Sequence, residues 1–146
     1  MSDIIDYHQH LWDLDRLNLN WLGRVPKMNG SLDFQDYHDA VKNIGVKKTV
    51  YMKVDAKQAD KQKEIDDMNL HCQAEPNEML GMVVFADLEK PEFTKFLDTN
   101  SSNNFINGVR QVLHNPETPP KHCLSPEFIE GIRELSKLRL LFNLCI

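Results

Sequence analysis

Short, nearly continuous apolar segments alternate with amphipathic segments along most of this chain, and this alternation constrains the fold more than any other feature. The apolar segments are rich in β-branched and aromatic residues, which favour strands. They span residues 4–10, 48–54, 79–88, 105–114 and 140–146. Strands that are covered on both faces have such unbroken apolar runs. The pattern therefore predicts an α/β protein whose parallel sheet is covered by helices.

Helices are expected between these strands, over residues 34–44, 56–75, 92–98 and 126–138. Gly45 is placed to end the first of them. The second is polar except for a narrow stripe of Ile65, Met68 and Cys72, which predicts an outer helix with one buried edge. Ser125 and Pro126 form a strong start for the last one, as an N-cap hydroxyl followed by proline at the first helical position.

Two α/β architectures fit five strands of this kind. A doubly wound sheet is one, but the chain contains neither G-x-G-x-x-G nor the Walker glycines that bind phosphate there. A barrel is the other, and it needs eight strands and roughly 250 residues. With 146 residues, this chain is too short for a complete barrel.

The composition excludes several classes of partner. The net charge is −5 and the 17 basic residues are spread along the chain, so nothing indicates nucleic-acid binding or a membrane surface. No apolar run approaches the roughly 20 residues of a spanning helix, and the first residues do not form a signal peptide. Cys72, Cys123 and Cys145 are sparse and odd in number, which favours reduced, buried thiols in a cytoplasmic protein.

The first predicted strand ends in a pair of histidines, His8 and His10, within the run IIDYHQHLW. Side chains alternate along a strand, so both point to one side, with Cα atoms about 6.6 Å apart. Two imidazoles at this spacing can converge on one metal ion. The spacing alone leaves two interpretations open: half of a metal site, or a polar pair at the end of a strand.

Five stretches of the chain resemble one enzyme family, in the same order. The run DYHQHLW followed by NWL is similar to the N-terminus of the amidohydrolase superfamily, in the branch of TIM-barrel hydrolases that includes lactonases. TVYMKVDA and LGMVVFADL look like its second and third strands, and INGVRQVLH like its strand with a G-V-R motif. The last residues, LSPEFIEGIRELSKLRLLFNLCI, resemble the next helix and the fifth strand. The resemblance implies a single domain, residues 1–146, that is the N-terminal part, about five strands, of a (β/α)8 barrel and is truncated after the fifth.

The same resemblance assigns roles to particular residues. It implies that His8 and His10 bind a divalent metal, most often zinc, or else the substrate directly, since some lactonases of this branch work without metal. Asp6 belongs to the same motif and would orient the strand or the histidines as a hydrogen-bond acceptor. Arg110 corresponds to the strand arginine of the family, suited to bidentate binding of a substrate carboxylate. An ion pair away from the site is its alternative role. His114 would line the pocket if the strand stays regular.

Other polar positions receive no firm role. Lys53 stands where relatives are expected to carry glutamine or an acid, and Asp87 is either a site residue or a helix N-cap. The remaining histidines are expected to be solvated or packed without partners: His38, His71 and His122.

The remaining site groups of the family come from later strands, as a histidine on the sixth and an aspartate, the general base, on the eighth. The strings that would carry them are not in this sequence. We therefore expect a hydrolase lineage acting on a lactone, ester or amide bond of a small carboxylated molecule, with this chain inactive alone. Open strand edges predict self-association. The alternative is a non-catalytic half-barrel that binds metal or ligand through His8 and His10 and acts by assembly.

Overall fold

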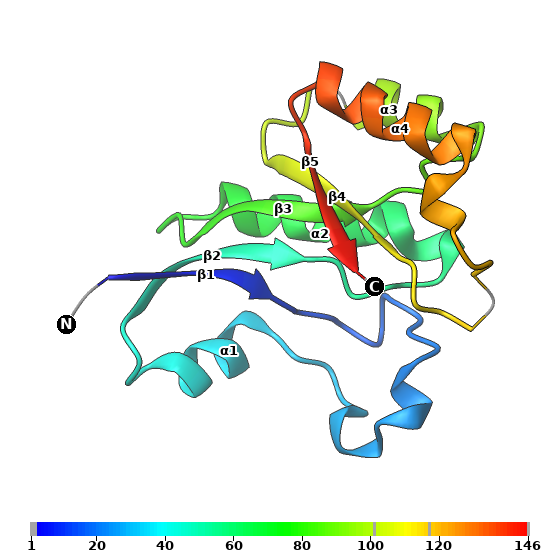
Figure 1. Ribbon diagram of the computed structural model, residues 1–146. Coiled ribbons are helices and arrows are strands. Elements are labelled where there is room, and N and C mark those ends of the chain that lie inside the picture. Colours follow the sequence, from blue (N-terminus) through cyan, green and yellow to red (C-terminus); the bar gives the residue numbers. More distant parts are fainter. Residues whose placement is uncertain (1–2, 101, 117, 146) are drawn as a thin grey trace. The chain divides into compact units, whose positions relative to one another are not determined.

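The computed structural model describes residues 3–100, 102–116 and 118–145, and it contains the expected alternation of strands and helices (Figure 1). The strands are β1 (Ile4–Gln9), β2 (Val46–Met52), β3 (Met79–Phe85), β4 (Ile106–Val112) and β5 (Leu141–Cys145). The helices are α1 (Phe34–Val41), α2 (Lys61–Gln73), α3 (Glu92–Asn100) and α4 (Pro126–Lys137). Each of these elements overlaps a segment predicted from the sequence.

The strands are hydrogen-bonded in the order β1-β2-β3-β4-β5, the same order in which they occur along the chain. The pairs β1–β2 and β4–β5 are parallel, with a helix in each connection. Sequential order without a reversal is the arrangement of neighbouring strands in a (β/α)8 barrel, whereas a doubly wound sheet reverses its strand order. The barrel alternative is therefore the correct one.

The chain divides into two compact units, Met1–Met82 and Val83–Ile146, and the division falls within β3. In the first unit β2 is buried from Thr49 to Met52. The predicted stripe of α2 is confirmed, because Ile65, Met68 and Cys72 are all buried. Gly45 was expected to end the first helix, but α1 already ends at Val41 with Lys42 as its C-cap, so that prediction was wrong. Gly45 has a φ of 87°, which a residue with a side chain rarely adopts, and it stands directly before β2.

The second unit contains α4, which packs on β5. The Ser125 hydroxyl accepts a hydrogen bond from the Phe128 N–H at 3.2 Å, which is the N-cap expected from the sequence. Phe128 is buried, and its ring meets Phe142 of β5 edge-on at a centroid distance of 5.6 Å. Phe142 therefore marks the face of β5 that α4 covers. Residues on the other face of β5 point away from this helix.

Candidate functional site

A β-bulge shapes the strand end that carries the two predicted metal ligands. Asp6 pairs with Thr49 and Gln9 with Tyr51, so β1 advances three residues where β2 advances two. The Oδ1 atom of Asp6 accepts a hydrogen bond from the backbone N–H of His8 at 2.9 Å, inside the bulged stretch between Asp6 and Gln9. Bulges re-aim side chains near the ends of strands. The sequence predicted a regular strand here, and the bulge was not foreseen.

Asp6 holds this bulge from both of its carboxylate oxygens. Its Oδ2 atom accepts a hydrogen bond from the Tyr37 hydroxyl at 2.6 Å, which ties β1 to α1. Partial burial, and then the neighbouring Asp6 carboxylate, raise the pKa of Tyr37 far above its ordinary value, so the phenol stays a donor. Of the two roles expected for Asp6, the structure supports the orientation of the strand.

The His8 and His10 rings lie close together and nearly perpendicular. Their centroids are 4.9 Å apart and their planes meet at 80°. Two imidazoles that bind one tetrahedral ion through bonds of about 2.0–2.1 Å have centroids about 5 Å apart. His8 is exposed and His10 is half-buried, so the pair is open to solvent. The spacing of the rings therefore fits a shared ion.

The His10 ring is oriented by a backbone carbonyl. Its Nδ1 atom lies 2.8 Å from the carbonyl oxygen of Met52, the last residue of β2. A carbonyl only accepts, so Nδ1 carries the hydrogen, and in the neutral ring Nε2 keeps its lone pair. Histidines that bind metals are commonly oriented in this way through their other nitrogen.

Within residues 3–100, 102–116 and 118–145, no group of three or more His, Cys, Asp or Glu side chains is arranged to hold a metal ion. His8 and His10 are thus two donors of a set that needs about four in a zinc site. The residues present fit the exposed half of such a centre and do not complete it.

A buried polar cluster lies at the end of β2, and sequence analysis missed it. The Oε1 atom of Glu64 in α2 accepts hydrogen bonds from the Tyr51 hydroxyl at 2.9 Å and the Val54 N–H at 2.8 Å. Burial raises the pKa of Glu64, although these donors oppose the rise. The signal was present in the sequence, since Glu64, Met68 and Cys72 recur at four-residue intervals on one helix face.

Lys53 also belongs to this part of the first unit. Its side chain is only 2% exposed, and its Nζ atom lies 2.5 Å from Oδ1 of Asp55. Asp55 has a φ of 62°, which turns the chain sharply after β2. The departure from the family pattern at Lys53 therefore has a local explanation, since the buried lysine pairs with the exposed Asp55 two residues later.

In the second unit, Arg110 and His114 are brought together around Cys145. The Nη2 atom of Arg110 donates a hydrogen bond to the Cys145 sulfur at 2.9 Å. The Nδ1 atom of His114 lies 3.7 Å from the same sulfur. His114 was expected on the face of Arg110, and their shared neighbour agrees with that. Cys145 was expected to be a buried small hydrophobe, but it is only partly buried.

His38, His71 and His122 were expected to be solvated or packed without partners, and this is wrong for His38 and His122, which lie against carboxylates, whereas His71 is packed. The Nε2 atom of His38 lies 2.5 Å from Glu78, and that of His122 lies 3.3 Å from Glu89. The ring of His71 stacks on Phe34 at a centroid distance of 5.5 Å. All three contacts join residues at least 33 positions apart, and sequence patterns do not reveal contacts over such distances.

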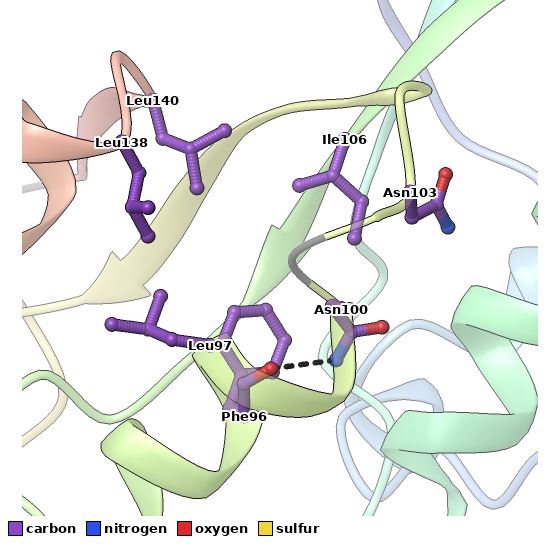
Figure 2. Close-up of a pocket in the computed structure, with 7 residues that line it drawn as sticks. All are labelled: Phe96, Leu97, Asn100, Asn103, Ile106, Leu138 and Leu140. Atoms are coloured by element: carbon purple, nitrogen blue, oxygen red, sulfur yellow. Dashed lines mark hydrogen bonds between the residues drawn. The ribbon is translucent and has the colours of Figure 1, made fainter.

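Two pockets lie away from the predicted site residues. One, of about 540 Å³ in the first unit, is lined by residues such as Trp12, Arg16 and Leu32. The other, of about 70 Å³, is the apolar pocket of Figure 2, where Phe96 and Leu97 face Leu140. It reaches Ile106, at the first residue of β4, whereas barrels build active sites at the opposite ends of their strands. We interpret the smaller pocket as a packing cavity.

Comparisons with known proteins agree with the fold. No family model matches the chain. It is 27% identical over 164 residues to an uncharacterised protein, y4mH, of Sinorhizobium fredii, across 99% of this chain and 54% of that protein. Its structure matches amidohydrolase 2 from Bifidobacterium longum subsp. infantis with a TM-score of 0.71 at 25% identity, across 99% of this chain and 52% of the other. The chain has an amidohydrolase fold.

Two further structures extend this match. An amidohydrolase of Burkholderia multivorans, solved with bound zinc, gives a TM-score of 0.80 at 15% identity, across 99% of this chain and 49% of that one. A probable 2-pyrone-4,6-dicarboxylic acid hydrolase of Acinetobacter baumannii, with citric acid bound, gives 0.64 at 14% identity. The chain spans about half the length of the proteins it matches. The expected resemblance to amidohydrolases and the expected partial barrel are both confirmed.

The search for membrane spans found no helix among the described residues with the length and apolar character to cross a bilayer.

Proposed function

We propose that this chain carries half of a hydrolase site of the amidohydrolase type, in which His8 and His10 hold a divalent metal ion. The reaction is attack of water on a lactone, ester or amide-type bond in a small carboxylated substrate. The observation that carries the proposal is the contact of His10 Nδ1 with the Met52 carbonyl, because it places the hydrogen of the neutral ring on Nδ1 and the lone pair on Nε2, as in histidines that bind metals. Zinc in the Burkholderia multivorans amidohydrolase supports the choice of ion.

The residues of this chain would act by binding and orienting. A bound metal ion supplies Lewis-acid activation of water. His8 and His10 would hold the ion, while Asp6 keeps the bulge that presents His8. In the second unit, Arg110 offers a planar guanidinium, which suits bidentate binding of a carboxylate, and His114 would line the carboxylate site beside it, since both lie against the Cys145 sulfur. The dicarboxylic acid named for the Acinetobacter baumannii protein supports a carboxylated substrate.

The chain is proposed to bind without catalysing turnover. The aspartate that acts as general base in the family stands in a G-S-D-W context, and that string does not occur in this sequence. General-base catalysis contributes about 10²–10⁴-fold to rate, so a site without its base is a weak catalyst.

Titration with zinc chloride alone tests the metal site. We expect the purified chain to bind zinc and a His8→Ala, His10→Ala double variant to lose that binding. His38→Ala is the matched control, because His38 is another exposed histidine of the first unit. Equal zinc binding by the double variant and the wild type would remove the metal proposal.

Titration with 2-pyrone-4,6-dicarboxylate tests the substrate class. We expect binding that an Arg110→Gln variant weakens, with the pyrone absorbance unchanged over time because the chain does not hydrolyse it. The exposed Arg133, paired with Glu130 in α4, provides the control variant Arg133→Gln. Binding that is unaffected by Arg110→Gln would contradict the assigned role of this arginine.

A second candidate function is a non-catalytic half-barrel that acts by assembly with a second copy. Exposed apolar side chains on the two outermost strands of the sheet favour it: Ile5 and Tyr7 on β1 are 56% and 46% exposed, and Leu141 and Leu144 on β5 are 59% and 57% exposed. Exposed apolar edge strands promote pairing between chains. Analytical ultracentrifugation tests this candidate: Ile5→Lys should reduce association, whereas Leu124→Lys, at an exposed leucine outside the strands, should not.

A further inference from the structure

The three cysteines of the chain occupy three different environments. Cys72 is fully buried in α2, and burial raises the pKa of its thiol to about 11. Cys123 and Cys145 are both partly buried, in a short 3-10 helix and at the end of β5 respectively. Only the thiolate form of cysteine is a good nucleophile, and neighbouring cations favour that form. The three thiols therefore serve as internal comparisons for one another.

Strand register places Cys145 on one face with Arg110 and His114. Arg110 pairs with Asn143 and Val112 pairs with Cys145, so Cys145 lies two residues beyond the partner of Arg110. Residues two apart share a face of a strand, and the Leu113 N–H continues the pairing by donating to the Cys145 carbonyl at 2.8 Å. His114, two residues beyond Val112, follows on the same side.

This face of β5 is the one opposite α4. Phe142 points to the α4 side of β5, so Cys145, three residues later, lies on the other side. Leu141 shares the face of Cys145 and is 59% exposed, and His114 is exposed as well. The sulfur thus has a cationic group at 2.9 Å and an imidazole nitrogen at 3.7 Å on a face that α4 leaves uncovered.

We propose that Cys145, His114 and Arg110 form a thiol-modification site that reacts with an anionic low-molecular-weight disulfide. In that reaction the Cys145 thiol gives its proton to Nδ1 of His114, and the thiolate sulfur attacks one sulfur of the disulfide. A bond forms between Cys145 and that sulfur as the disulfide's own S–S bond breaks. The departing thiolate takes the proton from the imidazolium, so Cys145 is oxidised and half of the reagent is reduced.

Arg110 sets the preference for an anionic reagent. Its guanidinium is always positively charged and lies 2.9 Å from the Cys145 sulfur, so it attracts the carboxylates of an anionic reagent toward that sulfur. A reagent with a carboxylate near its disulfide can therefore meet the guanidinium while its sulfur meets Cys145. The site uses the same arginine as the proposed substrate site, but it needs neither a metal ion nor hydrolysis.

Reaction of the purified full chain with oxidised glutathione tests the proposal, with each cysteine followed by peptide mass spectrometry. We expect Cys145 to form the mixed disulfide about ten-fold faster than Cys123, and Cys72 to remain unmodified. His114→Gln and Arg110→Gln should each slow modification of Cys145 and leave the Cys123 rate unchanged. Arg133→Gln, at an exposed arginine of the same unit, is the matched control.

The uncharged reagent 2-hydroxyethyl disulfide separates the roles of the two neighbours. His114→Gln should slow both reagents, whereas Arg110→Gln should slow oxidised glutathione more than the uncharged disulfide. Equal rates at Cys145 and Cys123 with oxidised glutathione would overturn the proposal. Because the readout is peptide mass, that result would leave zinc binding by His8 and His10 unaffected, and the two proposals fail separately.

Discussion

The Nδ1 atom of His10 donates a hydrogen bond to the carbonyl oxygen of Met52 at 2.8 Å, and this contact joins the end of β1 to the end of β2. Neighbouring parallel strands expose carbonyl groups at their ends, and here one of them selects the tautomer of a candidate metal ligand. The sheet itself thus fixes the hydrogen of the neutral His10 ring on Nδ1.

This relationship predicts the tautomer of His10 directly. When the His10 ring is neutral, long-range ¹H–¹⁵N correlation spectra should show its hydrogen on Nδ1. Added zinc should shift the ¹⁵N resonance of Nε2 in the same ring. His38 is the comparison, because its Nε2 faces the Glu78 carboxylate and should carry the hydrogen. A His10 ring with its hydrogen on Nε2 would contradict the proposed ligand geometry.

Asp6 is predicted to control zinc affinity without touching the ion. Asp6→Ala removes the acceptor for the His8 N–H and the Tyr37 hydroxyl, so the bulge that presents His8 loses its support. Loss of such orienting groups typically costs about 10–100-fold in metal affinity, and titration calorimetry with zinc should show a loss of that size.

Tyr37→Phe separates the two hydrogen bonds of Asp6. It removes only the bond from the hydroxyl and retains the one that Asp6 makes to His8. We expect it to weaken zinc binding less than Asp6→Ala does. An affinity in Asp6→Ala equal to that of the wild type would show that the bulge does not matter for the metal.

Glu64 is predicted to stabilise the first unit. Glu64→Ala leaves the Val54 N–H and the Tyr51 hydroxyl without this buried acceptor. The Val54 N–H loses its acceptor at a cost of about 1–3 kcal/mol, whereas the Tyr51 hydroxyl keeps the Leu11 carbonyl at 3.3 Å. Urea unfolding should therefore show a decrease in the free energy of unfolding of about that size. Glu130→Ala, whose side chain is 55% exposed, should change it little. Equal losses in the two variants would refute the role of Glu64.

Glu64 also predicts a pH dependence of stability with a definite sign. Burial raises the pKa of its carboxyl above the ordinary value of 4.5, so the folded chain holds this proton more tightly than the unfolded chain. The stability that protonation contributes is therefore present below pH 4.5 and is lost as the pH rises through the higher pKa of the folded state. Relative to Glu64→Gln, the wild type should lose stability over this window, and parallel unfolding curves across pH would contradict the assignment.

Local patterns were enough to predict the strands, the helices and the start of α4. The Ser125 N-cap depends on the residue itself and one three positions later, and the stripe of α2 depends on helical period alone. The family resemblance then identified the order of the strands as that of a barrel.

Contacts between distant residues explain what the sequence did not reveal. The bulge at Asp6 depends on its register with Thr49, and the position of Cys145 depends on register with Val112. Periodicity carries no information on register, because any two strands with alternating side chains can pair in several ways. The partners of His38 and His122 were missed because these contacts join residues 40 and 33 positions apart.

Gly108 provides a final prediction, about the strand pair that positions Arg110 and Cys145. Gly108 pairs with Leu141, and a Cβ atom at this glycine would lie 2.5 Å from the Leu141 carbonyl oxygen. That oxygen belongs to the backbone, so Gly108→Ala has to push β5 away from β4. Overpacking of this kind costs about 1–3 kcal/mol, which urea unfolding should detect. Gly23→Ala is the matched control, since a Cβ atom there would meet nothing within 4 Å.

Displacement of β5 would also separate Cys145 from Arg110, so Gly108→Ala should slow the reaction of Cys145 with oxidised glutathione while Gly23→Ala leaves it unchanged. Wild-type stability in Gly108→Ala would mean that the two strands do not approach as closely as the structure indicates.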